Sequence, residues 1–173
     1  NVVIIGGGPS GLLLSRLLSI DGIDNVVLEK HSQEHVTGRI RAGVLESVTI
    51  EMLKKAGVSD RLEKEGFNHD GIQLSFKNYG FRINLKQLTS KHVTVYGQTE
   101  VTKDLYRIIK KENGKIINNA EDVLPQAIET DQPFVTFKKN GIEKKIMCDW
   151  VAGCDGFHGI SRSIIPKSII KTY

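Results

Sequence analysis

A glycine-rich run near the amino terminus constrains the fold of this chain more than any other feature. Residues 6–11, with the sequence GGGPSG, follow directly on the apolar stretch 2–5, and a second apolar stretch, 26–28, leads into Glu29. An apolar strand, a glycine turn, an apolar helix, a second strand and an acid follow one another in this order in βαβ units that bind a dinucleotide. The sequence therefore predicts an α/β fold built on a parallel sheet.

Each residue of this run has a physical role in such a site. Gly6 allows the sharp turn out of the strand, Gly8 allows the backbone to approach a pyrophosphate, and Gly11 allows the helix to pack closely on the sheet. The free N–H groups at the start of the helix then face the anion. Ser10 at that helix start can bond a phosphate oxygen, or only its own backbone.

Glu29 is the acid that closes the second strand of the unit. Its position next to the first strand places it to accept hydrogen bonds from a ribose diol, whereas the carboxylate would repel a ribose 2′-phosphate. The dinucleotide expected in this site is therefore NAD or FAD and not NADP. The alternative is an ordinary exposed acid at the end of a strand.

Five further side chains are candidates with less local support. Arg39 and Arg41 alternate on an extended loop, where they can neutralise a pyrophosphate or remain solvated. Gln98 directly precedes a predicted helix and is ambiguous in the same way. Asp155 and His158 lie in a second glycine-bearing turn, where they can meet ligand hydroxyls or phosphate, although a lone histidine is more often structural or exposed.

The remaining pattern predicts alternating helices and strands. We expect helices over 9–18 and 46–56, a helix capped by Thr99 that ends before Gly114, and a hairpin of 72–76 and 81–85 joined at 78–80. A strand is expected over 93–96. The stretches 116–117, 123–129, 134–137 and 142–147 predict an antiparallel meander with a turn at 140–141, followed by a strand over 149–153.

Composition excludes several classes of protein. The 173 residues carry a net charge of +4, but Lys and Arg are interleaved with Glu and Asp, so we expect no nucleic-acid partner. No apolar run is long enough for a membrane helix, and the chain opens on a strand-like stretch instead of a leader, which favours the cytoplasm. Cys148 and Cys154 fit neither a redox pair nor metal-ligand spacing, so free buried thiols are expected.

No catalytic triad, metal cluster or pair of carboxylates stands out in the sequence. We therefore predict no catalytic residue and no metal site in this chain, and expect a cofactor to supply the chemistry.

Three motifs are similar to those of a known family: residues 39–46 (RIRAGVLE), 93–101 (VTVYGQTEV) and 152–162 (AGCDGFHGISR). They resemble the single-component flavoprotein aromatic hydroxylases, in particular those acting on 4-hydroxybenzoate, and the match runs from residue 2 to 173 in one register. The resemblance implies a Rossmann-like FAD-binding domain over 1–173, with a β-meander crossover and a small β subregion over 66–97. It also implies hydroxylation of 4-hydroxybenzoate to 3,4-dihydroxybenzoate by a homodimer that uses NADPH or NADH and O2.

The resemblance also assigns cofactor-binding roles by position. Ser10 and the glycine run match phosphate contacts, Glu29 matches the adenosine ribose contact, and Gln98 matches a further FAD contact. Asp155 and Gly156 match a motif that serves both FAD and the pyridine nucleotide, while His158 matches a residue that helps to bind NADPH, with Arg162 as a support. The loop expected to touch ribose, pyrophosphate and flavin comprises Arg39, Ile40, Arg41, Ala42, Gly43 and Val44.

This sequence departs from the family in two ways. Lys30 stands where an arginine is found, and the stretch 31–35 also differs, in the segment that reads the 2′-phosphate of NADPH; the choice between NADPH and NADH therefore stays open. Lysine keeps the charge but lacks the bidentate fork. In addition, family members continue for about as much again beyond Tyr173, so we expect an inactive fragment without the substrate site and the C-terminal helices.

Three alternatives differ in class from a hydroxylase. The chain can be a non-catalytic FAD-binding module, or an NAD-dependent Rossmann dehydrogenase, against which the arginine loop and the meander argue. A flavin-dependent disulfide reductase is disfavoured because the chain has no adjacent cysteine pair.

Overall fold

The computed structural model describes residues 1–170. The chain forms two compact units, one made of Asn1–Arg39 with Thr102–Tyr173 and the other of Ile40–Val101. Helix α6 (Gln98–Lys111) crosses the boundary between them, so its first four residues belong to the second unit and the rest to the first.

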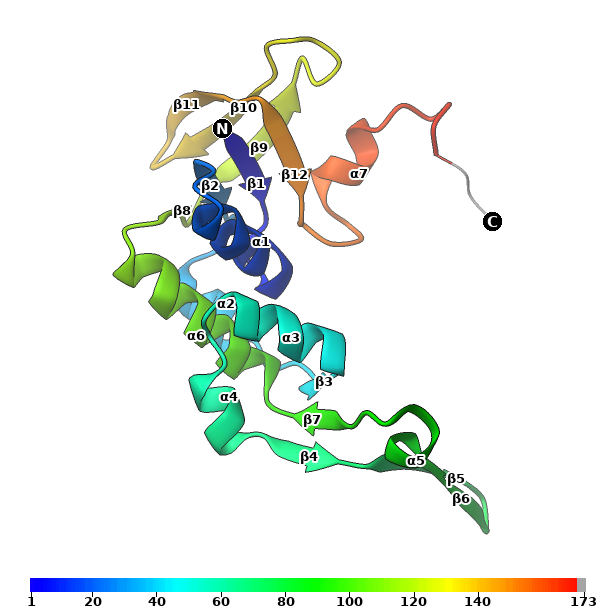
Figure 1. Ribbon diagram of the computed structural model, residues 1–173. Coiled ribbons are helices and arrows are strands. Elements are labelled where there is room, and N and C mark those ends of the chain that lie inside the picture. Colours follow the sequence, from blue (N-terminus) through cyan, green and yellow to red (C-terminus); the bar gives the residue numbers. More distant parts are fainter. Residues whose placement is uncertain (171–173) are drawn as a thin grey trace. The chain divides into compact units, whose positions relative to one another are not determined.

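The first unit is built on a four-stranded parallel sheet (Figure 1). Its strands lie in the order β12 (Trp150–Gly153), β1 (Val2–Ile5), β2 (Asn25–Leu28) and β8 (Lys115–Ile117). Helix α1 (Pro9–Ile20) connects β1 to β2. The predicted βαβ unit is thus present with its parallel pairing, and the predicted α/β class is confirmed.

One predicted pairing is wrong. The stretch 116–117 was expected to begin the antiparallel meander, but β8 pairs in parallel with β2 instead. Its place follows from the preceding α6, because a helix that returns the chain across a sheet delivers the next strand parallel to its neighbour. The meander itself has three strands, in the order β11 (Ile142–Met147), β10 (Phe134–Lys139) and β9 (Glu121–Gln126).

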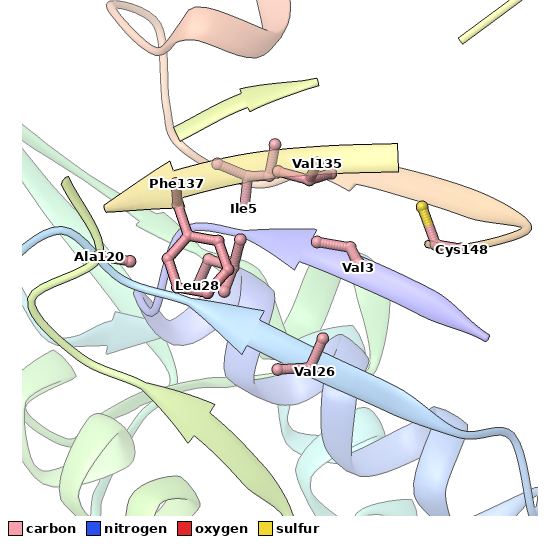
Figure 2. Close-up of a cluster of buried hydrophobic side chains, with 8 residues drawn as sticks. All are labelled: Val3, Ile5, Val26, Leu28, Ala120, Val135, Phe137 and Cys148. Carbon is pink, nitrogen blue, oxygen red and sulfur yellow. The ribbon is translucent and has the colours of Figure 1, made fainter. Parts of the chain in front are cut away.

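The central strand of the parallel sheet is covered on both faces, which explains why β1 is continuously apolar. Val3 and Ile5 on one face of β1 pack with Val135 and Phe137 of the meander strand β10 (Figure 2). Ile4 points to the other face, toward α1, where its side chain lies against Gly11. Alternation along one strand therefore joins the meander and the helix to a single core.

The second unit contains a small antiparallel sheet and a hairpin. Strands β3 (Val44–Leu45), β7 (Val93–Val95) and β4 (Phe67–His69) form the sheet, and β5 (Gly71–Phe76) with β6 (Tyr79–Asn84) forms the hairpin (Figure 1). Helix α3 (Ser47–Lys55) matches its prediction closely. The hairpin is also confirmed, but its turn lies at 77–78 rather than 78–80, with Lys77 in the left-handed region.

The missed elements are all short: α2 (Gln33–Gly38), α4 (Asp60–Glu65), α5 (Leu85–Thr89), β3 and β4. The predicted cap at Thr99 is wrong, because α6 already begins at Gln98 and the carbonyl of Gly97 accepts from the N–H groups of Glu100 and Val101. The second glycine turn leads into α7 (Ile160–Ile164). Among residues 1–170, no helix is both long enough and apolar enough to cross a membrane.

Candidate dinucleotide site

The glycine loop between β1 and α1 contains two glycines that the packing requires. A side chain on Gly6, whose φ is +109°, would overlap the carbonyl of Cys154, and one on Gly11 would overlap the carbonyl of Gly6. Gly6 therefore brings the loop against the end of β12, and Gly11 brings α1 against the loop. These contacts match the predicted roles of both glycines.

Gly8 differs from its neighbours because it faces open space. A Cβ built on Gly8 would meet no atom within 4 Å, and Gly8 caps α1 with no hydrogen bond from a side chain. The first N–H groups of α1 thus begin next to an opening in the structure. An anion at this place would meet those N–H groups and the positive end of the helix dipole.

Glu29 is buried at the end of β2, with 8% of its surface exposed. Its Oε2 accepts a hydrogen bond from the N–H of Gly7 at 2.6 Å, and its Oε1 accepts one from the N–H of His31 at 2.8 Å. The alternative of an exposed acid is therefore wrong. A carboxylate offers about four acceptor positions, so these two bonds leave capacity for a ligand hydroxyl.

Gly7 contacts Glu29 within the candidate site, and sequence reasoning gave it no role of its own. Besides donating to Glu29, it lies so close that a Cβ at this position would be 2.8 Å from the Cβ of Glu29. The only signal was a third glycine in the run, which the motif treats as a variable position. The contact joins the glycine loop to the acid across 22 residues of sequence.

Lys30 and the segment after it lie beyond this acid. Lys30 is exposed, and the ring of His31 stacks on that of His35 of α2 with centroids 4.2 Å apart. Burial lowers the pKa of His31, and the positive charges of His35, Lys30 and Arg39 add to this effect. The negative charge of Glu29 opposes it. The neutral form of this histidine is therefore favoured beside the expected adenosine end of the site.

A cavity of about 1080 Å³ adjoins the carboxyl end of β12. Ser10, Cys154, Asp155 and Gly156 are among its lining residues, so the structure brings the start of α1 and the second glycine turn to one cavity. Burial raises the pKa of the Cys154 thiol, and a hydrogen bond with Ser10 opposes that rise. Cys148 is buried and Cys154 half-buried; both are free thiols.

His158 lies on the outside of the second glycine turn. It is exposed, and its ring meets that of Phe157 edge-on with centroids 5.1 Å apart. The Arg162 guanidinium lies 5.1 Å from the centre of the same Phe157 ring. Arg162 and His158 are thus both packed against one aromatic side chain, and His158 is not among the residues lining the cavity.

The other predicted residues are grouped in the second unit, apart from the exposed Arg39, which belongs to the first. Gly43 packs so closely on the 96–97 backbone that a side chain there would overlap it, and its carbonyl accepts from the N–H of Tyr96 at 2.8 Å. This contact brings the loop beside the start of α6 at Gln98. The loop residues of this group are Ile40, Arg41, Ala42, Gly43 and Val44, of which all but Gly43 are exposed.

Within residues 1–170, no three His, Cys, Asp or Glu side chains gather in a way that could hold a metal ion. The geometry is that of a binding site: a glycine loop with an open helix start, a buried acid at the next strand and a second glycine turn across the sheet.

The model of the FAD binding domain family matches residues 1–172, so the chain belongs to that family. The chain is 44% identical to p-hydroxybenzoate hydroxylase of Acinetobacter baylyi over 173 residues, which cover 99% of this chain and 43% of that protein. It is 28% identical to 12-dehydrotetracycline 5-monooxygenase/anhydrotetracycline 6-monooxygenase of Streptomyces rimosus, covering 95% of this chain and 32% of that protein.

Solved structures share the fold. The crystal structure of p-nitrophenol 4-monooxygenase from Pseudomonas putida superposes with a TM-score of 0.81 at 24% identity, covering 95% of this chain and 43% of that one. The chain thus spans less than half the length of these relatives.

The residues of the first unit fit FAD. The cofactor's pyrophosphate needs a backbone that it can approach closely, and Gly8 leaves that space free while Gly6 and Gly11 close the turn around it. Its adenosine ribose needs an acceptor at the end of the second strand, where Glu29 is held by two backbone N–H groups.

Proposed function

We propose that this chain is the FAD-binding part of a flavoprotein that hydroxylates 4-hydroxybenzoate to 3,4-dihydroxybenzoate with NAD(P)H and O2. The observation that carries the proposal is the 44% identity to p-hydroxybenzoate hydroxylase of Acinetobacter baylyi across 99% of this chain. The motifs at 39–46, 93–101 and 152–162 lie within that match and favour the same reaction.

In this proposal the first unit binds the ADP half of FAD. The N–H groups at the start of α1 and the Ser10 hydroxyl bond the pyrophosphate, with Gly6, Gly8 and Gly11 shaping the loop. Glu29 accepts from the adenosine ribose. Bound FAD supplies the redox chemistry, and the protein contributes binding, orientation and charge.

The remaining residues complete the cofactor sites. We assign the loop from Arg39 to Val44 and the side chain of Gln98 to FAD, where the forked guanidiniums of Arg39 and Arg41 offset the charge of the pyrophosphate. Asp155 and Gly156 serve FAD and the pyridine nucleotide, and Lys30 and His158 serve the pyridine nucleotide.

The proposal assigns no catalytic residue to this chain. Every assigned role is one of binding, and the chain spans 43% of the relative that it matches over its whole length. We therefore propose that the chain alone is a binding module that holds FAD without turnover, and that the complete protein works as a homodimer. Sedimentation of the complete protein measures its oligomeric state.

The test uses the complete protein. The expected result is a yellow preparation with bound FAD, in which 4-hydroxybenzoate accelerates NADPH or NADH oxidation and yields an equal amount of 3,4-dihydroxybenzoate. 4-Nitrophenol is the comparison substrate, because a relative of the same fold acts on it. If the protein hydroxylates 4-nitrophenol and not 4-hydroxybenzoate, the proposed substrate is wrong. If it binds NAD tightly and carries no flavin, the assignment to the flavoproteins is wrong.

A further inference from the structure

The carboxylate of Asp155 is held in place by the turn that follows it. Its Oδ2 accepts a hydrogen bond from the backbone N–H of Ser161, at the second position of α7, at 3.0 Å. Asp155 thus acts as the capping acceptor for a helix that begins five residues after it. The residue in the capping position itself is Gly159, which has no side chain to do so.

Gly159 is also a packing requirement for this carboxylate. A Cβ on Gly159 would overlap the Cγ and both oxygens of Asp155. The φ of Gly159 is −73°, an angle that any residue adopts, so backbone conformation does not require glycine here. Glycine is required because the Asp155 carboxylate occupies the space that a side chain at position 159 would need.

The second oxygen of the carboxylate remains available. Within residues 1–170, Asp155 Oδ1 has no hydrogen-bond partner, and Asp155 lines the cavity next to Ser10. One oxygen is therefore fixed by the protein, and this fixes the direction of the other.

We propose that Gly159 and the backbone N–H of Ser161 are positioning residues, which lock the Asp155 carboxylate in the orientation that binds the cofactor. This inference rests on the proposed FAD-binding function and extends it to two residues that themselves touch no ligand. Any side chain at 159 displaces the carboxylate, and loss of the N–H at 161 releases it.

The packing around Ser161 supports a role for its backbone rather than its hydroxyl. The Ser161 Oγ is buried without a hydrogen-bond partner in residues 1–170. Its Cβ lies so close to β12 that a side chain on Gly153 would overlap it. This contact seats the first turn of α7 on the end of β12, and so fixes the N–H that Asp155 accepts.

The first experiment is a double-mutant cycle in the complete protein, measured as FAD affinity by quenching of flavin fluorescence. Asp155→Asn and Gly159→Ala are each expected to weaken FAD binding by roughly tenfold, the loss of one hydrogen bond to a charged group. If Gly159 acts through Asp155, adding Asp155→Asn to Gly159→Ala changes the affinity less than twofold. Additive losses, or a Gly159→Ala variant with normal affinity, overturn the proposal.

A proline pair tests the N–H of position 161, with a proline one position earlier as the control. Proline is tolerated in the first turn of a helix, so Ser161→Pro removes the donor to Asp155, whereas Ile160→Pro, one position earlier, leaves it. Only Ser161→Pro is expected to weaken FAD binding, with thermal unfolding of the FAD-free proteins as the control for folding. Equal affinities of the two variants overturn the inference alone; wild-type protein that binds no FAD overturns the proposed function with it.

Discussion

Replacing Gly8 by alanine separates binding from folding. The backbone of Gly8 has φ −74° and ψ 178°, which alanine adopts without strain, and the new methyl group meets no atom within 4 Å. Alanine is a poorer helix cap than glycine, which destabilises the folded protein by about 0.5–1 kcal/mol. Alanine also lowers the conformational entropy of the unfolded chain, which stabilises the folded protein by about 0.4–1 kcal/mol and offsets the first effect. The free energy of unfolding of the FAD-free protein is therefore expected to stay within about 0.5 kcal/mol of wild type.

The effect on FAD is expected to be much larger. A methyl group placed where the backbone meets the pyrophosphate costs about 1–3 kcal/mol of contact energy, which is roughly a 5- to 150-fold loss of affinity. Fluorescence titration with FAD and urea unfolding measure the two quantities. Gly11→Ala is the contrasting variant, because its side chain overlaps the Gly6 carbonyl and must destabilise the protein itself. A Gly8→Ala variant with wild-type affinity for FAD would refute the reasoning.

Three further predictions follow from the same site. Glu29→Gln loses charge-assisted bonds from Gly7 and His31, so FAD affinity should fall by about 1–2 kcal/mol, and the free energy of unfolding should also fall. Glu34→Gln, at an exposed position, is the control; equal effects of the two substitutions contradict the role of Glu29. Because the pKa of His31 is lowered in the folded protein, the contribution of His31 to the free energy of unfolding is fully present above pH 6.5 and is lost as the pH falls. Urea unfolding at pH 7.5 and at pH 5.5 should therefore show that His31→Gln loses less stability between these two pH values than wild type does. An equal loss of stability in the two proteins counts against this role of His31. Burial raises the pKa of Cys154, so iodoacetamide should alkylate it slowly, and more slowly with FAD bound; a rate unaffected by FAD contradicts its place at the site.

Local patterns in the sequence predicted the elements that depend on neighbouring residues. The unit β1–α1–β2 follows from two apolar stretches and the glycines between them, and the turn of 140–141 follows from Asn and Gly, which both adopt the left-handed region here. The short helices α2 and α4 were missed because six residues carry too little periodicity. A signal for α2 did exist, since Ser32 caps it by accepting from the N–H of His35.

Contacts between distant residues were beyond sequence reasoning. The parallel pairing of β8 depends on where α6 returns the chain, which the apolar pattern of 116–117 does not show. Gly7 and Glu29 are 22 residues apart, and the fit of Gly159 to Asp155 depends on atomic packing. The sequence motif identified Gly6, Gly8 and Gly11, but it did not identify Gly7 and Gly159, which contact the carboxylates of Glu29 and Asp155.

The most direct measurement of the central claim compares FAD with FMN, which lacks the adenosine half, as ligands of the complete FAD-free protein. Because the glycine loop, the start of α1 and Glu29 are assigned to the ADP half, FAD should bind at least a hundredfold more tightly than FMN, and ADP should compete with it. FMN binding as tight as FAD, or no flavin binding at all, would contradict the account.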